Sequence, residues 1–154
     1  MKPRLPSPWV LTILSVAIVS LPASAQTKER FRGEGTITPT HINVGDCFDM
    51  ADFSAAGSSS VLGDFEAVGR LRVDYCGIGP DIEGDITFTV ANGDQLSMHF
   101  VGMRVDPTTY VARIAGTGGT GQYQNARVKG HLLIENYNLS DSFDMSFHGK
   151  IRLP

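Results

Sequence analysis

The sequence predicts an all-β protein, built as a single small antiparallel β-barrel of about eight strands. No window after residue 25 shows the sustained 3.6-residue apolar period of an amphipathic helix. Instead, seven or eight runs alternate apolar and polar residues and are joined mostly by turn-length segments, which is typical of a β-sandwich or barrel. Glycines also lie inside the strand-like runs, and such glycines permit the sharp coiling of a small barrel. They favour a barrel over a sandwich, and they are Gly33, Gly35, Gly69, Gly84, Gly102, Gly130 and Gly149.

The first 25 residues are expected to be a cleaved signal peptide, leaving residues 26–154 as the barrel domain. Two basic residues near the start precede an apolar run over residues 9–21, and Ala23-Ser-Ala25 is the small-x-small pattern of a cleavage site. A retained N-terminal anchor is the alternative, but the apolar run is shorter than the ~20 residues that span a bilayer. We therefore expect a secreted or periplasmic protein with no stable membrane anchor after cleavage.

The net charge and the two cysteines limit the kinds of partner and the compartment that we expect for this protein. Without residues 1–25 the chain has 11 Lys and Arg against 16 Asp and Glu, a net charge of −5. A mildly acidic chain has no overall electrostatic attraction to nucleic acid, so no nucleic-acid partner is expected. Cys47 and Cys76 are the two cysteines. In an oxidising compartment they favour a disulfide that stabilises the fold by roughly 3–4 kcal/mol, with a free reactive thiol as the alternative.

The first third of the domain gives the weakest strand signals. Residues 31–38 predict a first strand that ends at Pro39. Residues 44–60 contain a Ser/Ala/Gly cluster, and we expect a long loop with at most a short strand at residues 47–50.

The rest of the chain alternates more clearly. Strands are expected at residues 65–75 and 82–90, followed by a type I′ hairpin at Asn92-Gly93 and a returning strand at 95–104. A strand at 110–115 leads into a loop with four glycines in six residues, which cannot hold a helix. The last expected strands cover the residues 128–137 and 142–153.

Several of these segments resemble a known family. They are the hairpin Ala91-Asn-Gly-Asp-Gln-Leu96, the run from Ala112 to Tyr123 with its glycine-threonine-glycine turn, the following Ala126, and Phe147-His-Gly-Lys-Ile151. Together they resemble the allene oxide cyclase and dirigent-like β-barrel superfamily, especially its bacterial secreted members. Gln122 and Tyr123 stand where that family usually has Arg and Phe, which weakens any assignment to a subfamily.

The resemblance implies a barrel with a pocket at one mouth, often a dimer or trimer. It implies a hydrophobic small molecule as partner, whose cyclisation or coupling is guided by shape without a cofactor. None of the family's catalytic positions carries over, because the matching segments are not the catalytic ones.

Candidate catalytic residues come from polar positions within the strands. His99 lies mid-strand and is suited to act as a general base near neutral pH if it faces the interior. Arg113 and Glu135 are further polar candidates for the interior. The alternative for each is an ordinary solvent-facing side chain.

Candidate ligand-binding residues form a second group. Arg70 and Arg72 share a strand face and would make a polar floor that grips a carboxylate, if that face is the inner one. Tyr75 and Tyr110 combine apolar area with a donor at a pocket mouth, and His148 has the same status as His99. Solvent exposure or cross-strand packing is the alternative for each. No metal site is expected, because no His-x-His or Cys-x-x-Cys spacing occurs.

Two functions stay open at this point. The first is a barrel that binds a hydrophobic small molecule, with or without cofactor-free isomerase or cyclase activity. The second is a non-enzymatic binding or interaction module whose barrel is filled by its own side chains. A barrel axis blocked by Phe, Met and Leu side chains would weigh against catalysis.

Overall fold

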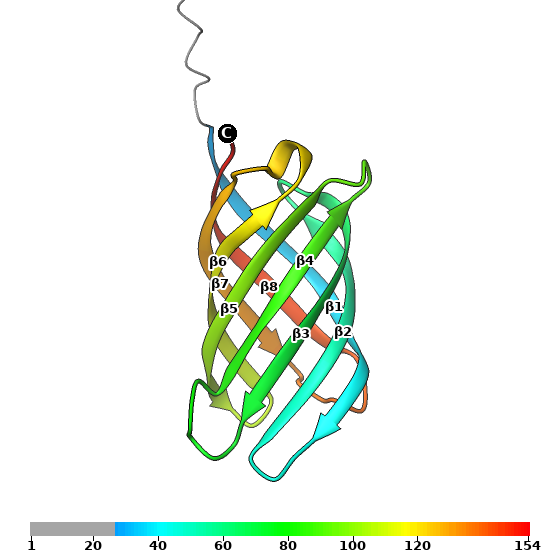
Figure 1. Cartoon of the computed structure of the whole chain (residues 1–154), viewed down its shortest axis with the longest axis vertical. Helices are drawn as coiled ribbons and strands as arrows, with labels where there is room; N and C mark the ends of the chain where they lie inside the picture. Colours follow the sequence, from blue (N-terminus) through cyan, green and yellow to red (C-terminus); the bar gives the residue numbers. More distant parts are fainter. Residues whose placement is uncertain (1–26) are drawn as a thin grey trace, which may run out of the picture.

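The computed structural model describes residues 27–154, so the expected signal peptide lies outside the described residues. Eight antiparallel strands form one closed barrel, as the sequence predicted (Figure 1). Each strand pairs with the next, and the first closes against the last, with Lys28 opposite Arg152 at one end of the seam. The elements are β1 (Lys28–Val44), β2 (Phe48–Ser59), β3 (Gly63–Asp74), β4 (Ile82–Val90), β5 (Gln95–Asp106), β6 (Thr109–Gly119), the 3₁₀ turn η1 (Gly121–Tyr123), β7 (Arg127–Glu135) and β8 (Phe143–Arg152).

The two ends of the barrel differ. β1 begins and β8 ends at the same end of the barrel, which also carries η1 and which we call the terminal end (Figure 1). The opposite end carries the β1–β2, β3–β4, β5–β6 and β7–β8 connections. A disulfide joins Cys47 in the β1–β2 connection to Cys76 in the β3–β4 connection, so we call it the disulfide end. Within residues 27–154 no helix is long and apolar enough to cross a membrane.

The predictions for the first third of the domain were wrong in two places. β1 does not end at Pro39 but continues to Val44, with a register shift between Pro39 and His41. Such an irregularity accommodates a residue that lacks the N–H donor. The expected long loop is mostly strand β2, whose inward positions carry Ala51 and Ala55. Small buried side chains give little hydrophobic contrast along the sequence, which is why the alternation was missed.

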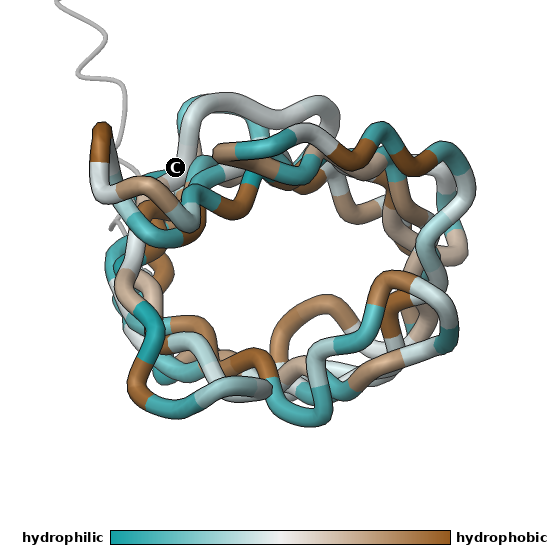
Figure 2. The backbone as a smooth tube through the Cα atoms, turned by 90° about the horizontal axis from the view of Figure 1, so that it is seen from below, coloured by the Kyte–Doolittle hydropathy of each residue, from teal (hydrophilic) through white to brown (hydrophobic). Residues whose placement is uncertain are grey.

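Apolar side chains fill the barrel interior. Phe31, Phe65, Phe88 and Phe147 form one aromatic cluster, with ring centroids 4.8 to 6.0 Å apart. Leu, Ile, Met and Val side chains with little or no exposure pack around them. The open ring of backbone seen down the axis in Figure 2 is therefore occupied by side chains. This is the filled barrel that the sequence left as an alternative.

Glycines and phenylalanines are matched across strands in this core. A Cβ added to Gly33 would overlap the ring of Phe147, its partner on β8. The same relation holds at three more pairs, so a missing side chain on one strand makes room for a ring from the next. Those pairs are Gly57 with Phe65, Gly69 with Phe53, and Gly84 with Phe100.

Candidate functional site

The three predicted catalytic residues lie on the outer wall of the barrel. His99 is partly exposed, and its Nδ1 lies 2.9 Å from Oδ1 of the exposed Asp85. Arg113 and Glu135 are exposed on β6 and β7, and His148 is exposed on β8. The structure does not bring His99, Arg113 and Glu135 into the interior or to one another, so any role for them belongs to the outside of the barrel.

The two predicted arginines also face outward. Arg70 Nε donates to Asp52 Oδ1 at 2.7 Å, and 66% of the Arg70 side chain is exposed. Arg72 donates to Glu83 at 3.0 Å and to Asp74 at 3.2 Å. Neither guanidinium therefore forms a polar floor inside the barrel.

The two predicted tyrosines, in contrast, meet at the disulfide end. Tyr75 follows β3, and Tyr110 lies near the start of β6. They lie close to Asp49 on β2 and Tyr137 in the β7–β8 connection, and we call these four residues the mouth cluster. Tyr75 Oη donates to Asp49 Oδ2 at 2.8 Å. The cluster gathers most of the chain's phenols, since the sequence has four tyrosines and the fourth, Tyr123, lies at the terminal end.

Two polar atoms of the mouth cluster are buried without a partner. Within residues 27–154, Asp49 Oδ1 makes no hydrogen bond, and Tyr137 Oη makes none of ordinary geometry, although the neighbouring Tyr75 hydroxyl is close enough to contribute to the raised pKa of Tyr137. Both Asp49 and Tyr137 are more than nine-tenths buried. The Tyr137 ring packs between Tyr110 and Phe143, at centroid distances of 5.1 and 5.2 Å. An acceptor oxygen and a hydroxyl are thus held in an aromatic surrounding, where an unsatisfied polar group is costly.

The disulfide positions the acid and the first tyrosine of the cluster. Cys47 stands two residues before Asp49, and Cys76 directly follows Tyr75. The Tyr75 backbone N–H also donates to the Cys47 carbonyl at 2.8 Å. Two segments that lie 29 residues apart in sequence are therefore fixed side by side, with Asp49 and Tyr75 facing each other. The disulfide itself confirms the predicted pairing of the cysteines.

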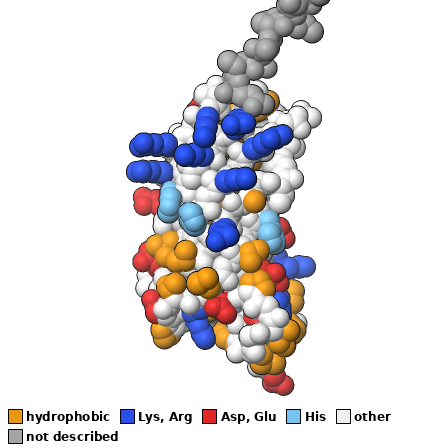
Figure 3. Space-filling model, turned by 90° about the vertical axis from the view of Figure 1, so that its left-hand side faces the viewer, with side chains coloured by type: hydrophobic (Ala, Val, Ile, Leu, Met, Phe, Trp, Pro, Cys, Tyr) orange, Lys and Arg blue, Asp and Glu red, His pale blue; other side chains and the backbone are white. Residues whose placement is uncertain are grey.

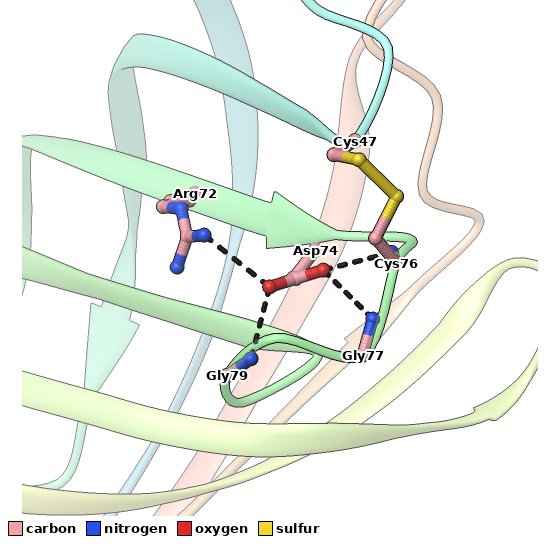
Figure 4. The surroundings of a disulfide bond; sticks show 6 residues. All are labelled: Cys47, Arg72, Asp74, Cys76, Gly77 and Gly79. Carbon is pink, nitrogen blue, oxygen red and sulfur yellow. Dashed lines mark hydrogen bonds and ion pairs between the residues drawn. A yellow bond between two sulfur atoms is a disulfide. The ribbon is translucent and has the colours of Figure 1, made fainter.

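The loop after Tyr75 is organised by a buried carboxylate (Figure 4). Asp74 Oδ1 accepts the backbone N–H groups of Cys76 and Gly77, and Oδ2 accepts the N–H of Gly79 and a guanidinium N–H of Arg72. Burial of Asp74 alone would raise its pKa, but these donors outweigh burial and lower it. The charged form of Asp74 therefore holds the loop that carries Tyr75 and Cys76.

The phenols of the mouth cluster are kept neutral. Burial, followed by the hydrogen bond to Asp49, raises the pKa of Tyr75 to about 12. Burial also raises the pKa of Tyr137 and that of Tyr110, although the nearby Arg104 guanidinium opposes the shift at Tyr110. At physiological pH these groups act as hydrogen-bond donors and acceptors, and only Asp49 among the four carries an ionisable carboxyl.

Sequence reasoning found half of the mouth cluster. Asp49 was placed in an expected long loop with at most a short strand at residues 47–50, and its inward position follows only once the full length of β2 is known. Tyr137 was placed at the end of an expected strand over residues 128–137, but β7 ends at Glu135 and Asn136 adopts a positive φ of 56°. That turn, with the Tyr137 N–H donating to the Thr108 carbonyl at 2.9 Å, directs the ring into the mouth.

Comparison with known proteins supports the fold. No family model matches the chain, and no curated protein matches it by sequence. Among solved structures, the chain is similar to the pterocarpan synthase dirigent protein GePTS1, with a TM-score of 0.63 at 13% identity over 92% of this chain and 97% of that one. A pyocyanin demethylase also matches, with a TM-score of 0.45 at 15% identity over 79% of this chain and 99% of that one. The similarity to the dirigent protein shows that the chain has a dirigent-like barrel fold.

Proposed function

We propose that this protein is an exported dirigent-like barrel that binds a hydrophobic small molecule carrying a hydroxyl or phenol at the mouth cluster. The observation that carries the proposal is the buried pair of unpartnered polar atoms, Asp49 Oδ1 and Tyr137 Oη. The similarity to a dirigent protein named as a pterocarpan synthase supports a role in holding and orienting a small molecule.

The chemistry of the cluster fits a hydroxyl. Asp49 Oδ1 accepts the ligand's O–H, and Tyr137 Oη donates to the ligand's oxygen, so one group satisfies both atoms. A hydrogen bond to a charged group contributes about 1.5–3 kcal/mol, and an unmade one costs about as much. The rings of Tyr110 and Phe143 are fully buried, so the apolar body of the ligand packs against side chains exposed at the disulfide end, such as Tyr75 and Ile78.

Tyr75 controls access to the cluster in this proposal. Its side chain is 44% exposed and lies between Asp49 and solvent, held by one hydrogen bond and by the Arg104 guanidinium 5.9 Å from the ring centroid. Rotation of this side chain exposes Asp49 to an incoming ligand. The neighbouring disulfide keeps the backbone fixed while the side chain turns.

The filled interior limits how deeply a ligand can enter the barrel. With the axis packed by aromatic and aliphatic side chains, the ligand is held at the mouth and not enclosed in a deep chamber. This favours binding and orientation over a shape-enforced cyclisation or isomerisation inside the barrel. It also supports a second candidate function, a non-enzymatic interaction module that has no small-molecule ligand.

Isothermal titration calorimetry offers a direct test, because it reports binding without an optical signal from the phenol probe. We expect 4-hexylphenol to bind at least tenfold more tightly than 4-hexylanisole, which lacks the hydroxyl. Asp49→Asn and Tyr137→Phe, which keep size and shape, should each remove most of that preference.

The matched control is Tyr123→Phe, which removes a buried phenol at the terminal end. It should leave the tenfold preference intact. Equal binding of the phenol and the anisole, or the same loss in Tyr123→Phe, would contradict the proposal. Absence of binding by either probe would leave the interaction module as the function of this fold.

A further inference from the structure

A second surface of the barrel carries a concentrated positive charge. On the outer wall of the barrel, basic residues of β1, β8 and β7 lie opposite one another and form rows that run across these three strands. One row of three lies nearest the terminal end, and a second row of three lies next to it, toward the middle of the barrel. The first row is Lys28, Arg152 and Arg127, and the second is Arg30, Lys150 and Lys129.

A third row continues the pattern toward the middle of the barrel. Arg32 pairs with His148, His148 with His131, and His131 with Arg113 on β6. The imidazoles of His131 and His148 are neighbours, with centroids 5.4 Å apart and ring planes inclined by 31°. We call the three rows the basic patch, and Figure 3 shows it as the blue and pale blue side chains on the upper half of that face.

The patch holds eight of the 11 Lys and Arg residues that follow residue 25. None of the eight forms an ion pair within the described part of the chain, whereas Arg70 and Arg72 outside the patch both do. Like charges placed directly opposite one another on a sheet are destabilising. Here such pairs of like charges are repeated over three adjacent rows, with no carboxylate between the rows. Binding of an external anion, which neutralises these charges, best explains the arrangement.

The shape of the patch favours binding of a narrow, extended anion. A shallow hollow of about 670 Å³ lies between the second and third rows, over the backbone of Gly130 and Gly149. Successive rows are about 7 Å apart, because they are two residues apart along a strand. The hollow therefore fits one extended polymer chain that runs across the strands, with cations on both of its sides.

The surface beyond the patch excludes broad anions. Glu34 lies one row past Arg32, and Asp144 and Glu135 pair with each other two rows past the histidines. A flat bilayer or a nucleic-acid duplex covering the patch would also cover these carboxylates, since they lie within two rows of it. Single-stranded nucleic acid is usually held by exposed aromatic side chains, and no Phe, Tyr or Trp lies in the three rows. A symmetric contact between two copies would place one basic patch against the other and leave both without neutralising carboxylates, and association through another face is tested below by light scattering.

We propose that the basic patch binds a linear anionic polysaccharide that carries carboxylate or sulfate groups. Arg and Lys at this spacing pair with such groups along the polymer, and Arg does so bidentately. The disulfide is typical of compartments outside the reducing cytosol, where acidic polysaccharides are abundant linear polyanions. This proposal does not depend on the small-molecule site, because the two surfaces share no residue.

Binding to immobilised alginate and dextran sulfate, with neutral dextran as reference, tests the proposal. We expect binding to both anionic polymers in 50 mM NaCl, at least tenfold weaker binding in 300 mM NaCl, and none to neutral dextran. Lys150→Glu, in the middle of the patch, should weaken binding at least tenfold. Arg70→Glu changes the net charge equally on β3, outside the patch, and should weaken it less than twofold.

Four results would overturn the proposal. The first is absence of binding to both anionic polymers, and the second is equal loss in Lys150→Glu and Arg70→Glu. The third is tighter binding to a 20-base-pair DNA duplex or to phosphatidylserine vesicles than to either polysaccharide. The fourth is self-association in low salt, seen by light scattering and removed by Lys150→Glu, in a protein that binds neither polymer. Failure of 4-hexylphenol to bind would not affect any of these results.

Discussion

Lys150→Glu should make the fold more stable although it removes binding at the basic patch. Lys150 is exposed on β8 and lies directly between Arg30 on β1 and Lys129 on β7. The substitution converts two like-charge pairs into two opposite-charge pairs at the same positions. A surface selected only for stability would not keep a lysine there.

The size of the effect follows from the two pairs. A cross-strand charge pair contributes roughly 0.2–1 kcal/mol, favourable or unfavourable according to sign. Taking about 0.25 kcal/mol for each repulsion removed and each attraction gained raises the free energy of unfolding by about 1 kcal/mol. For a domain of about 130 residues, with about 2.1 cal/mol/K per residue, this raises Tm by about 4 °C.

Thermal denaturation followed by circular dichroism at two salt concentrations provides the measurement. In 20 mM NaCl the gain should appear in full, because the screening length exceeds the ~5 Å between paired side chains, and in 1 M NaCl, with a screening length of about 3 Å, most of it should vanish. Lys150→Gln should give about half the gain, and Arg70→Glu, which breaks an exposed ion pair with Asp52, should give none. A Tm of Lys150→Glu at or below that of the unsubstituted protein in low salt would refute the electrostatic reasoning.

Three further predictions concern the core and the disulfide end. Replacing both Cys47 and Cys76 by Ser should lower the free energy of unfolding in urea by about 3.6 kcal/mol, from the entropy of a loop closed over 29 residues; a loss under 1 kcal/mol would contradict the chain-entropy account. Phe147→Ala should cost about 3–5 kcal/mol in the same assay, because its ring covers Gly33 and joins the aromatic cluster; a cost typical of a surface site would contradict the packing. Every tyrosine has its pKa raised by burial, so the neutral phenol is favoured in the fold and its stability is present in full below the unfolded value near pH 10. That stability should be lost as the pH rises toward about 12, so phenolate absorbance at 295 nm should appear later in the folded than in the urea-unfolded protein; coincident curves would contradict the raised pKa values.

The sequence predicted best where large apolar residues alternate. Residues 82–90 place Ile82, Ile86 and Phe88 on one face, and all three are buried in β4. In β2 the inward residues include two alanines and an aspartate, so the same periodicity carries little hydrophobic contrast. Glycines within strands correctly indicated the barrel, because at several of them a phenylalanine from the neighbouring strand occupies the space that a side chain would take.

The candidate site was harder to predict because it depends on register. Tyr75 and Tyr110 were suggested by their chemistry, but their meeting with Asp49 and Tyr137 requires four segments to converge at one end of a closed sheet. The histidine and arginine candidates were chosen as polar residues within strands, and period-two alternation places such residues outside when the interior is apolar. The outward direction follows from the pattern once the barrel is known to be filled.

The net charge of the chain does not describe how charge is distributed over the outer surface of the barrel. A value of −5 led us to expect no nucleic-acid partner, but this value averages a surface on which positive charge gathers at one end of three neighbouring strands and negative charge toward the other. The alternation that fills the barrel places every second residue outside, and the antiparallel register then aligns those residues into rows across strands that are distant in sequence. Arg32 and His148 are direct neighbours for this reason, although 116 positions separate them. A basic row can therefore be recognised only after the pairing of the first strand with the last is known, and in a filled barrel the outer wall and the mouths are the surfaces left for binding.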